Sequence, residues 1–292
     1  MKEKIKSFAK KLQLEYTGIV SAAPMTELRE ILSSRRKSHG FTSFEEADLE
    51  KRTVPELTLP GAKSIIVCLF PYYNGPNREG NLSRFARIPD YHKVVIKRLE
   101  KICEFIKQEK PDANVLPFVD SGPLADKFLA YQAGLGFFGK NTLFINEKYG
   151  SYVFIGYIIT DLALAPDAPL ERTCDNCGQC IRACPGGALK DAFDFHAQSC
   201  VSCITQLKTI SNEQEKILSA QSSVYGCDIC QEVCPHNMDI PLTPIAEFQK
   251  SLLNNIEEKT LSAMSNREFV RTYQQFPFFW RGKSAILKNF RK

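Results

Sequence analysis

Nine of the 11 cysteines lie between residues 174 and 234: seven form two runs, and two lie in the segment between the runs. The first run, TCDNCGQCIRACP over 173–185, has the spacing C-x2-C-x2-C-x3-C-P. The second, YGCDICQEVCP over 225–235, has C-x2-C-x3-C-P. Short C-x2-C pairs also bind zinc, but the longer run closed by Cys-Pro is typical of 4Fe–4S ferredoxins. The sequence therefore predicts iron–sulfur clusters and electron transfer.

Eight cysteines are needed for two 4Fe–4S clusters, and in two-cluster ferredoxins the fourth cysteine of a run binds the other cluster. Under this rule the first cluster is bound by four cysteines, namely Cys174, Cys177, Cys180 and Cys234. The second cluster receives three ligands from the two runs, namely Cys184, Cys227 and Cys230. The segment QSCVSC between the runs offers Cys200 or Cys203 as its fourth ligand, and the spacing does not decide between them.

The other two cysteines, Cys68 in SIIVCLF and Cys103 in LEKICEFI, lie in apolar segments and are expected in the core. The N-terminal stretch MKEKIKSFAKKLQLEY is amphipathic and lacks the apolar run of a signal peptide. No stretch approaches the roughly 20 apolar residues of a membrane-spanning helix. Dense, closely spaced cysteines in such a chain indicate metal binding in a reducing compartment, so we expect a cytoplasmic protein.

The chain has 292 residues, of which 43% are hydrophobic, so a sizeable core can form around these groups. Within residues 1–170 we expect strands over 17–22, 63–70, 114–119, 141–146 and 151–160. The same part is expected to have helices over 3–13, 25–36, 90–109 and 123–133. The alternation predicts an α/β (α+β) layer domain, in which SIIVCLF is a central strand buried on both faces and SYVFIGYIIT is another interior strand.

A connection rich in alanine and proline, LALAPDAPLERT, leads from residues 1–170 to the cysteine region. Residues 171–240 contain few large apolar side chains, so we expect a ferredoxin-like domain in which clusters crosslink the chain. Residues 241–292 are expected to form a helical C-terminal segment that packs on the first domain. This segment has seven Lys or Arg residues from Arg267 onward. With a net charge of +5, the chain permits a polyanionic partner without requiring one.

The reaction centre is expected in the first domain. No G-x-G-x-x-G follows a strand there, so a dinucleotide site is not predicted. Asp120, in VDSGP at the end of an apolar strand, would act as a general acid if burial raised its pKa. Taken alone, the residue fits the N-cap of the following helix better.

Several longer motifs occur in one order along the chain: DLEKR, LPGAKSIIV, DYHKV, VDSGP, AGLGFFGKN and YGSYVF, then the two cysteine runs, SNREF and WRGK. Over nearly its whole length the sequence resembles the epoxyqueuosine reductases, which are cobalamin- and iron–sulfur-dependent enzymes of queuosine biosynthesis. The resemblance implies reduction of epoxyqueuosine to queuosine at the tRNA wobble position, with two electrons and two protons entering and water leaving. It also implies that the clusters pass electrons to a cobalamin, whose reduced cobalt attacks the epoxide.

Residue roles also follow from the resemblance. Asp120 matches a proton donor, which replaces the interpretation as a cap alone. Cobalamin contacts are implied for Arg52, Ser83, Asp120, Lys140, Asn141, Thr142, Ile155, Ser202 and Asp228. Cys200 matches the family's single cysteine between the runs, so it becomes the eighth cluster ligand. His92, in DYHKV, has either a substrate role or a local one at the start of its helix. No D-x-H-x-x-G pattern is present, which fits cobalamin bound without a protein histidine.

The partners implied are tRNA carrying epoxyqueuosine and a low-potential electron donor of the flavodoxin or ferredoxin type, with no membrane and a monomeric chain. Candidate tRNA contacts are the C-terminal cations Arg281, Lys283, Lys288 and Arg291. Trp280 and the neighbouring phenylalanines either stack on RNA or pack internally. Two alternatives stay open: a related cobalamin reductase acting on a small molecule, as in dehalogenases, and a non-enzymatic electron carrier.

Overall fold

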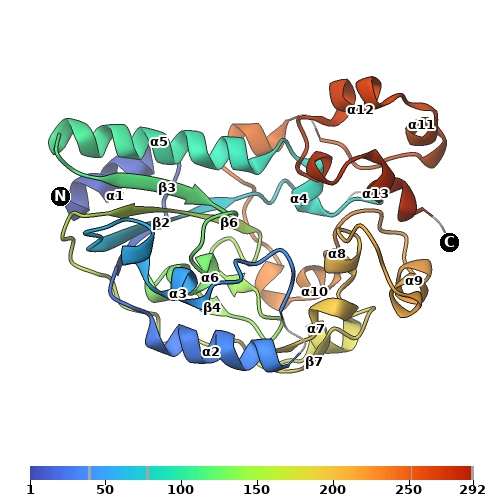
Figure 1. The fold of residues 1–292 in the computed structure, drawn as a ribbon, viewed down its shortest axis with the longest axis horizontal. Helices are drawn as coiled ribbons and strands as arrows, with labels where there is room; N and C mark the ends of the chain where they lie inside the picture. Colours follow the sequence, from blue (N-terminus) through green and yellow to red (C-terminus); the bar gives the residue numbers. More distant parts are fainter. Residues whose placement is uncertain (39–40, 77–78, 251, 291–292) are drawn as a thin grey trace.

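The computed structural model describes residues 1–38, 41–76, 79–250 and 252–290. Its centre is a four-stranded antiparallel sheet with the strand order β1-β2-β6-β3 (Figure 1). The strands are β1 (Thr17–Ser21), β2 (Ser64–Pro71), β6 (Val153–Thr160) and β3 (Val115–Val119). All eight residues of β2 are buried, and the strand pairs with β6 from Ser64↔Thr160 to Pro71↔Val153. The predicted central strand and its interior neighbour are therefore confirmed.

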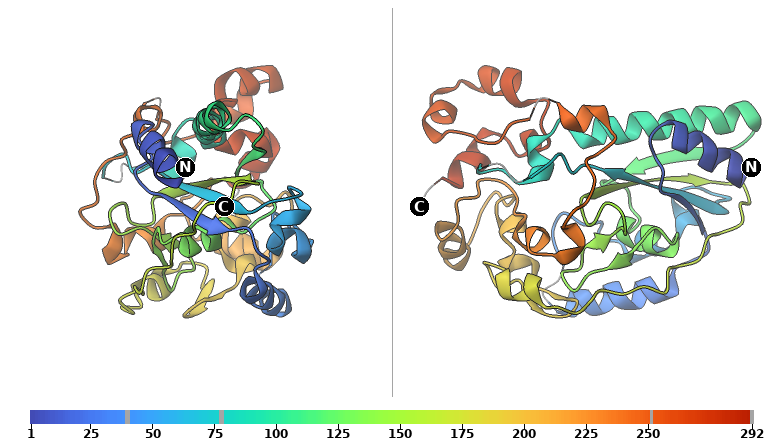
Figure 2. Two further views of the ribbon diagram at one scale, coloured as in Figure 1. Left: turned by 90° about the vertical axis from the view of Figure 1, so that its left-hand side faces the viewer. Right: turned by 180° about the vertical axis from the view of Figure 1, so that it is seen from behind.

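Helices cover both faces of the sheet (Figures 1 and 2). One face carries α1 (Lys2–Lys11) and α5 (Tyr91–Glu109). The other carries α2 (Thr26–Lys37), α3 (Leu49–Thr53) and α6 (Asp126–Gln132). Side chains of β6 alternate between the two apolar cores: Ile158 packs on the α5 side, and Ile155 and Ile159 pack on the α6 side. The mixed α/β architecture agrees with the sequence. None of the described helices is long and apolar enough to cross a bilayer.

Of the predicted strand over 141–146, only β5 (Phe144–Ile145) forms, and it pairs with β4 (Phe137–Phe138) in a small hairpin. The turn between them is closed by the Asn141 side chain, whose Oδ1 accepts from the backbone N–H of Leu143 at 3.2 Å. Thr142 in the same turn has φ = 61°, a left-handed conformation incompatible with an extended strand. The helix predicted from residue 123 begins only at Asp126.

The cysteine region is built from short elements around the two runs. They are α7 (Gln179–Ala183), β7 (Leu189–Asp191), β8 (Asp194–Phe195), α8 (Val201–Ile204), α9 (Asn212–Ser219) and α10 (Ile229–Glu232). The second run is fastened to a segment of the first domain that includes α4 (Arg84–Arg87). There the Ser83 N–H donates to the Tyr225 carbonyl at 2.9 Å, and the Val224 N–H donates to the Asn81 carbonyl at 2.7 Å.

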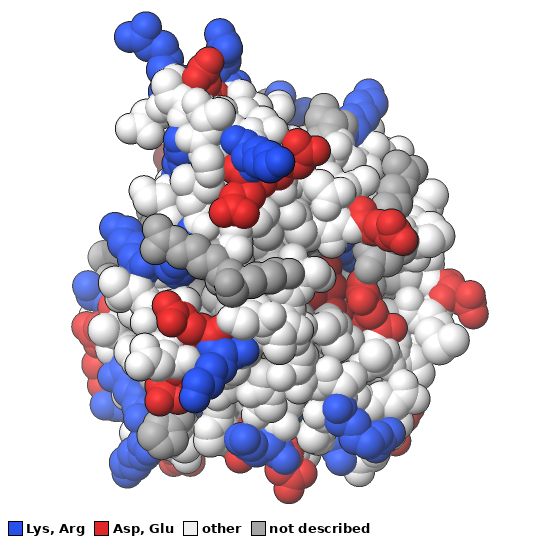
Figure 3. All heavy atoms as spheres, turned by 90° about the vertical axis from the view of Figure 1, so that its right-hand side faces the viewer, with Lys and Arg blue, Asp and Glu red and all other residues white. Residues whose placement is uncertain are grey.

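The C-terminal segment contains α11 (Glu258–Ala263), α12 (Asn266–Tyr273), the 3-10 helix η5 (Pro277–Arg281) and α13 (Lys283–Lys288). Phe248 belongs to the core beside α5, and Phe278 packs in a separate core with Leu82 and Tyr225. Apolar cores thus cross the predicted limits at 170 and 240, and the division into 1–170, 171–240 and 241–292 stays a prediction. Figure 3 views the molecule from this end, where Lys and Arg are interspersed with Asp and Glu.

Candidate active site

The first group of thiols lines a small cavity at the edge of the cysteine region. Its cysteines are Cys174, Cys177, Cys180 and Cys234, and Lys140, Asn141 and His236 complete the wall. Burial raises the pKa of the Cys234 thiol, and the thiols of Cys174, Cys180 and Cys177 raise it further. Cys234 of the second run therefore lies with three cysteines of the first run, which is the crossed arrangement that the two-cluster rule predicts.

The second group contains Cys184, Cys200, Cys227 and Cys230. Burial raises the pKa of Cys230, and the three other thiols of the group add to this. The pKa of Cys200 is likewise raised by burial and by Cys184. Cys203 differs from them: its pKa is raised to about 11 by burial, then by Cys200 and Glu45, with no other thiol contributing. The structure thus brings Cys200 into the group and leaves Cys203 facing Glu45.

Both groups suit a cluster. Four neighbouring thiols resist ionisation, and iron supplies the positive charge that stabilises four thiolates. Beside the second group, Gly226, which precedes Cys227, packs closely against Ser83. Its φ is 77°, and a Cβ there would lie 2.0 Å from Ser83 Oγ, so this position requires glycine. Among the residues that the structure describes, no three His, Cys, Asp or Glu side chains are arranged to hold a single metal ion.

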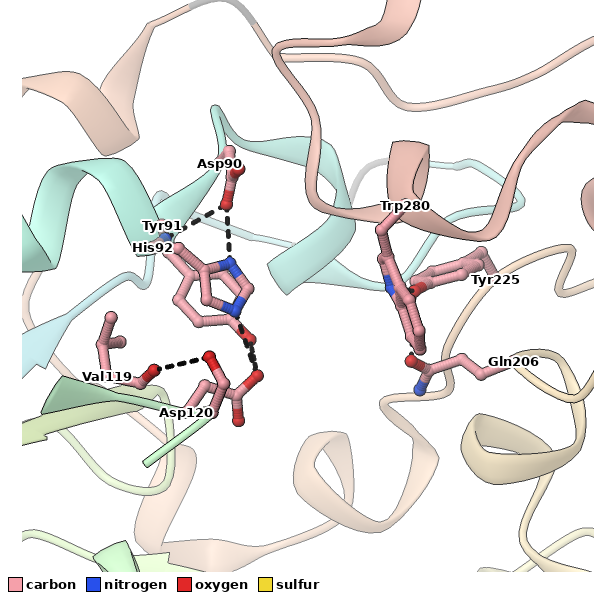
Figure 4. A network of polar contacts seen from close by, with 9 residues as sticks. Asp90, Tyr91, His92, Val119, Asp120, Gln206, Tyr225 and Trp280 are labelled. Atoms are coloured by element: carbon pink, nitrogen blue, oxygen red, sulfur yellow. Dashed lines mark hydrogen bonds and ion pairs between the residues drawn. The ribbon is translucent and has the colours of Figure 1, made fainter. Parts of the chain in front are cut away.

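Asp120 lies at the end of β3 and accepts hydrogen bonds from the start of α5 (Figure 4). Its Oδ2 accepts from the Tyr91 hydroxyl at 2.7 Å and lies 3.1 Å from His92 Nε2. The other ring nitrogen, His92 Nδ1, lies 2.7 Å from Asp90 Oδ1. Asp90 also caps α5 through the His92 N–H, so the helix start fixes the imidazole. The interpretation of Asp120 as a cap is wrong, because α6 begins six residues later with Ala125 at its N-cap.

These contacts set the protonation states. Burial alone would lower the pKa of His92, but the hydrogen bonds to Asp120 and Asp90 outweigh it and raise the pKa to about 9. Burial alone would raise the pKa of Asp120, but the hydrogen bonds from His92 and Tyr91 lower it. The expected upward shift for Asp120 is therefore contradicted in the isolated chain. Both ring nitrogens face carboxylates, which only the imidazolium can satisfy as a double donor.

The Lys127 side chain interacts with both Asp120 and the second thiol group. The Asp120 side chain is 61% exposed, and Lys127, the second residue of α6, is exposed as well. Yet burial lowers the pKa of Lys127, whose charge also interacts with Cys230. Burial raises the pKa of neighbouring Asp126 well above its ordinary value, and Asp120 adds to this. These side chains reach solvent although protein surrounds them, and from this we infer a recess between Asp120 and Cys230.

Several residues expected at cobalamin lie near Asp126 and Lys127 or near the second thiol group. Arg52 pairs with Glu45 and is 12% exposed, and its buried Nε has no hydrogen-bond partner. The buried Ser83 Oγ also lacks one. The Thr142 carbonyl accepts from Lys127 Nζ at 3.3 Å, and Asn141 Nδ2 donates to the Cys230 carbonyl at 3.4 Å. The unpartnered atoms of Arg52 and Ser83 fit a ligand rich in amide groups, as cobalamin is.

The remaining expected contacts lie deeper or elsewhere. Asp228 is buried and accepts from the Arg84 N–H at 2.6 Å, and burial raises its pKa to about 6. Ile155 is 9% exposed within the core beside α6. Ser202 is half-buried beside Cys203, and Lys140 lines the cavity of the first thiol group. The expected cofactor contacts are therefore spread around both thiol groups, not gathered at one point.

The C-terminal cations are largely engaged within the chain. Lys283 Nζ donates to the Ser262 carbonyl at 3.2 Å and to the Met264 carbonyl. Lys288 Nζ donates to the Leu207 carbonyl, and burial lowers its pKa. The guanidinium of Arg281 lies 4.3 Å from the centre of the Trp280 ring, and Arg291 lies outside the described residues. Their contact with tRNA stays a prediction, and Lys283 and Lys288 have an internal anchoring role.

Sequence reasoning missed several residues of the site. Tyr91 stands beside His92 in DYHKV, and its hydroxyl hydrogen-bonds to Asp120. Asp126 and Lys127 follow VDSGP, where the motif itself was the only available signal. Glu45 reaches the site through its pairs with Arg52 and Arg35 across a loop, for which the sequence has no periodic signal.

Two four-thiol sites beside an acid–base group in a recess define an iron–sulfur oxidoreductase. A family model described as epoxyqueuosine reductase QueG, DUF1730, matches residues 52–121, and a 4Fe-4S double cluster binding domain matches residues 173–237. The epoxyqueuosine reductase of Bacillus cereus is 36% identical over 99% of this chain and 78% of its own length. That of Bacillus subtilis is 34% identical over 99% of this chain and 77% of its own. The chain belongs to the epoxyqueuosine reductase family.

Solved structures agree with this assignment. An epoxyqueuosine reductase crystallised with an epoxyqueuosine-modified tRNA-Tyr stem loop is similar with a TM-score of 0.91 and 33% identity, covering 99% of this chain and 79% of that one. A catabolic reductive dehalogenase in complex with 3-bromo-4-hydroxybenzoic acid is 13% identical with a TM-score of 0.50, which shows a shared fold alone.

Proposed function

We propose that this protein reduces epoxyqueuosine to queuosine at the wobble position of tRNA. The observation that carries the proposal is the Tyr91–His92–Asp120 group, which faces a recess leading to the second thiol group in a chain of this family. The reaction removes the epoxide oxygen: two electrons and two protons enter, a carbon–carbon double bond forms, and the oxygen leaves as water. Electrons arrive from the cysteine region and protons from the opposite wall.

The chain's own groups handle the protons. Because His92 and Tyr91 keep the Asp120 carboxylate ionised, the proton held at His92 Nε2 first passes to Asp120, which then donates it to the epoxide oxygen. Asp90 holds the imidazole in place through Nδ1. Tyr91 donates to the same carboxylate oxygen, and burial raises its pKa well above the ordinary value, so its hydroxyl stays protonated. Substrate in the recess would displace water from Asp120, which favours its protonated form.

The cofactors proposed are two 4Fe–4S clusters and one cobalamin. The first cluster is held by Cys174, Cys177, Cys180 and Cys234, and the second by Cys184, Cys200, Cys227 and Cys230. When bound, cobalamin supplies a strongly reducing, nucleophilic cobalt centre for the epoxide. The unpartnered polar atoms of Arg52 and Ser83 would hydrogen-bond the corrin amides, and the turn with Asn141 and Thr142, which bonds to the Cys230 carbonyl, would help to hold the cofactor.

The proposed partners are tRNA bearing epoxyqueuosine and a low-potential flavodoxin or ferredoxin, with the chain acting as a monomer in the cytoplasm. A small-molecule reductase of the dehalogenase type is less favoured, since the likeness to those proteins is confined to fold. A pure electron carrier would leave the acid–base group at Asp120 without a role.

A turnover assay with nucleoside analysis tests the proposal. Protein reconstituted with iron, sulfide and cobalamin is supplied with a low-potential reductant and tRNA carrying epoxyqueuosine, and queuosine is measured by mass spectrometry. We expect stoichiometric conversion in the unchanged chain and a loss of about 100-fold or more in Asp120→Asn, the scale of a removed general acid. Absence of queuosine in fully loaded protein refutes the proposed function, and full turnover in Asp120→Asn refutes the proton-donor role.

A further inference from the structure

Two aromatic side chains remain exposed near the recess. Trp280 is 56% exposed and Phe44 is 43% exposed, and their rings meet edge to face with centres 6.0 Å apart. In the same FPFFW stretch, Phe276 and Phe278 are buried in the core, so only part of this aromatic cluster serves packing. Burying an indole would be favourable, and its exposure in a fixed position therefore suits a contact with a partner.

The indole is held rigidly. Trp280 Nε1–H donates to the Tyr225 hydroxyl at 2.9 Å, and that hydroxyl donates to Gln206 Oε1 at 3.1 Å (Figure 4). Tyr225 is itself 1% exposed, so the chain of bonds connects Trp280 to the interior. A ring fixed in this way loses little conformational freedom when another ring stacks on it.

One cation, Arg281, lies beside both rings. The Arg281 guanidinium lies over the Trp280 ring at 4.3 Å from its centre and 5.7 Å from the centre of Phe44. Its Nε is buried without a hydrogen-bond partner, so the group has donor capacity left. An aromatic face beside a guanidinium is the combination that binds unpaired nucleotides, because the ring stacks on a base and the cation meets a phosphate.

The position is close to the reaction centre. The segment that carries Trp280 contacts the start of α5, because the Asp90 N–H donates to the Gln275 carbonyl at 2.7 Å. Asp90 also holds the ring of His92, which contacts Asp120. In Figure 4 the Tyr91–His92–Asp120 group is on the left and Trp280 is on the right, beside Tyr225 and Gln206.

We infer that Trp280 is a stacking platform for an unpaired base of the anticodon loop adjacent to the modified nucleotide, with Arg281 at a neighbouring phosphate. The inference rests on the proposed function. To bring its epoxide to Asp120, the modified nucleotide must leave the stack of the loop, and its neighbours lose a stacking partner. The indole replaces that partner and so helps to position the modified base in the recess. Such stacking does not depend on the identity of the neighbouring base.

Binding of an anticodon stem loop, measured by fluorescence anisotropy of a labelled RNA on the fully loaded chain, tests this. We expect Trp280→Leu to bind about 10-fold or more weakly, because it keeps apolar bulk but has no aromatic face. Trp280→Phe keeps a face and should stay within about 3-fold of the unchanged chain. Val270→Ala, which alters another side chain that is 43% exposed on α12, is the matched control and should bind normally.

A purely structural role for Trp280 predicts a different pattern. Both variants lose the N–H donor to Tyr225, so equal losses in Trp280→Phe and Trp280→Leu would overturn the inference. Abasic nucleotides placed one at a time in the loop identify the base that stacks on Trp280. At that position, removing the base should weaken RNA binding by the unchanged chain but should not weaken binding by Trp280→Leu further. If the affinity losses from the abasic nucleotide and from Trp280→Leu simply add at every loop position, the inference is also overturned.

Two further outcomes are distinguishable. If the unchanged chain binds no stem loop, the proposed function fails together with this inference. If Trp280→Leu loses bound cobalamin, measured by its absorbance, while RNA affinity is unchanged, Trp280 belongs to the cofactor site and the inference alone fails.

Discussion

Replacing Asp120 by Asn should release His92 from one of its two carboxylates. The rise in the pKa of His92 from 6.5 to about 9 corresponds to about 3 kcal/mol shared between Asp90 and Asp120. Because the Asp120 side chain is 61% exposed, water screens its share, and we expect about 1 kcal/mol from this partner. The pKa of His92 should therefore fall from about 9 to about 8 in Asp120→Asn.

The measurement is a pH titration of the histidine ring resonances in isotope-labelled protein without cobalamin. The chain has four histidines, so His92→Gln assigns the signal. A pKa of His92 near 6.5 in the unchanged chain, or one that Asp120→Asn leaves at about 9, would refute the reasoning.

The interaction between His92 and Asp120 should also affect the stability of the folded chain. Folding raises the pKa of His92, so the stabilisation from this interaction is fully present just below pH 6.5 and is lost as the pH rises towards 9. Folding lowers the pKa of Asp120, so the same stabilisation disappears again in acid, as the pH falls through the carboxyl titration. The difference in unfolding free energy between the unchanged chain and Asp120→Asn should therefore be largest at about pH 5–6. A difference that grows between pH 6.5 and 9 would contradict this.

Cys200→Ala should lose about half of the bound iron by elemental analysis, whereas Cys203→Ala should keep all of it, since only Cys200 lies with the other three thiols of the second group; the reverse result would exchange the two assignments. Gly150→Ala should destabilise the chain by about 2 kcal/mol in urea unfolding, because φ is 58° and the new Cβ would lie 2.0 Å from Asn237 Oδ1. Gly61→Ala is the control, because Gly61 has φ = 80° but open space around it, so only the backbone cost applies. Its free energy of unfolding should fall by about 1 kcal/mol. Equal losses in the two variants would contradict the steric argument.

Local patterns in the sequence were sufficient for much of the fold. The unbroken apolar run of β2 predicts burial on both faces, because only an interior strand places every side chain in a core. The two cysteine runs predict which thiols come together, since their spacing is imposed by the shape of a cluster. In both cases the information lies within a dozen residues of the feature.

The Tyr91–His92–Asp120 group could not be predicted from such local patterns. Asp120 meets Tyr91 and His92 because the end of β3 packs against the start of α5, a contact that no periodicity encodes. The direction of its pKa depends on the same contact: burial without His92 would raise it, and the hydrogen bonds reverse the sign. The turn at Asn141 was misread as a strand for a related reason, since its hydrogen bonds and the left-handed backbone at Thr142 follow no periodic pattern.

The sharing of apolar cores across the chain has a consequence for biosynthesis. The core containing Leu82 and Tyr225 also requires Phe278 and Ile286, which are translated after every cysteine of the two runs. At 5–20 residues per second, the roughly 50 residues from Cys234 to Ile286 take about 3–10 s to synthesise. During that interval all nine thiols have been made while the core beside them is incomplete. A newly made chain therefore passes through a stage that is open to cluster loading and equally open to oxidants.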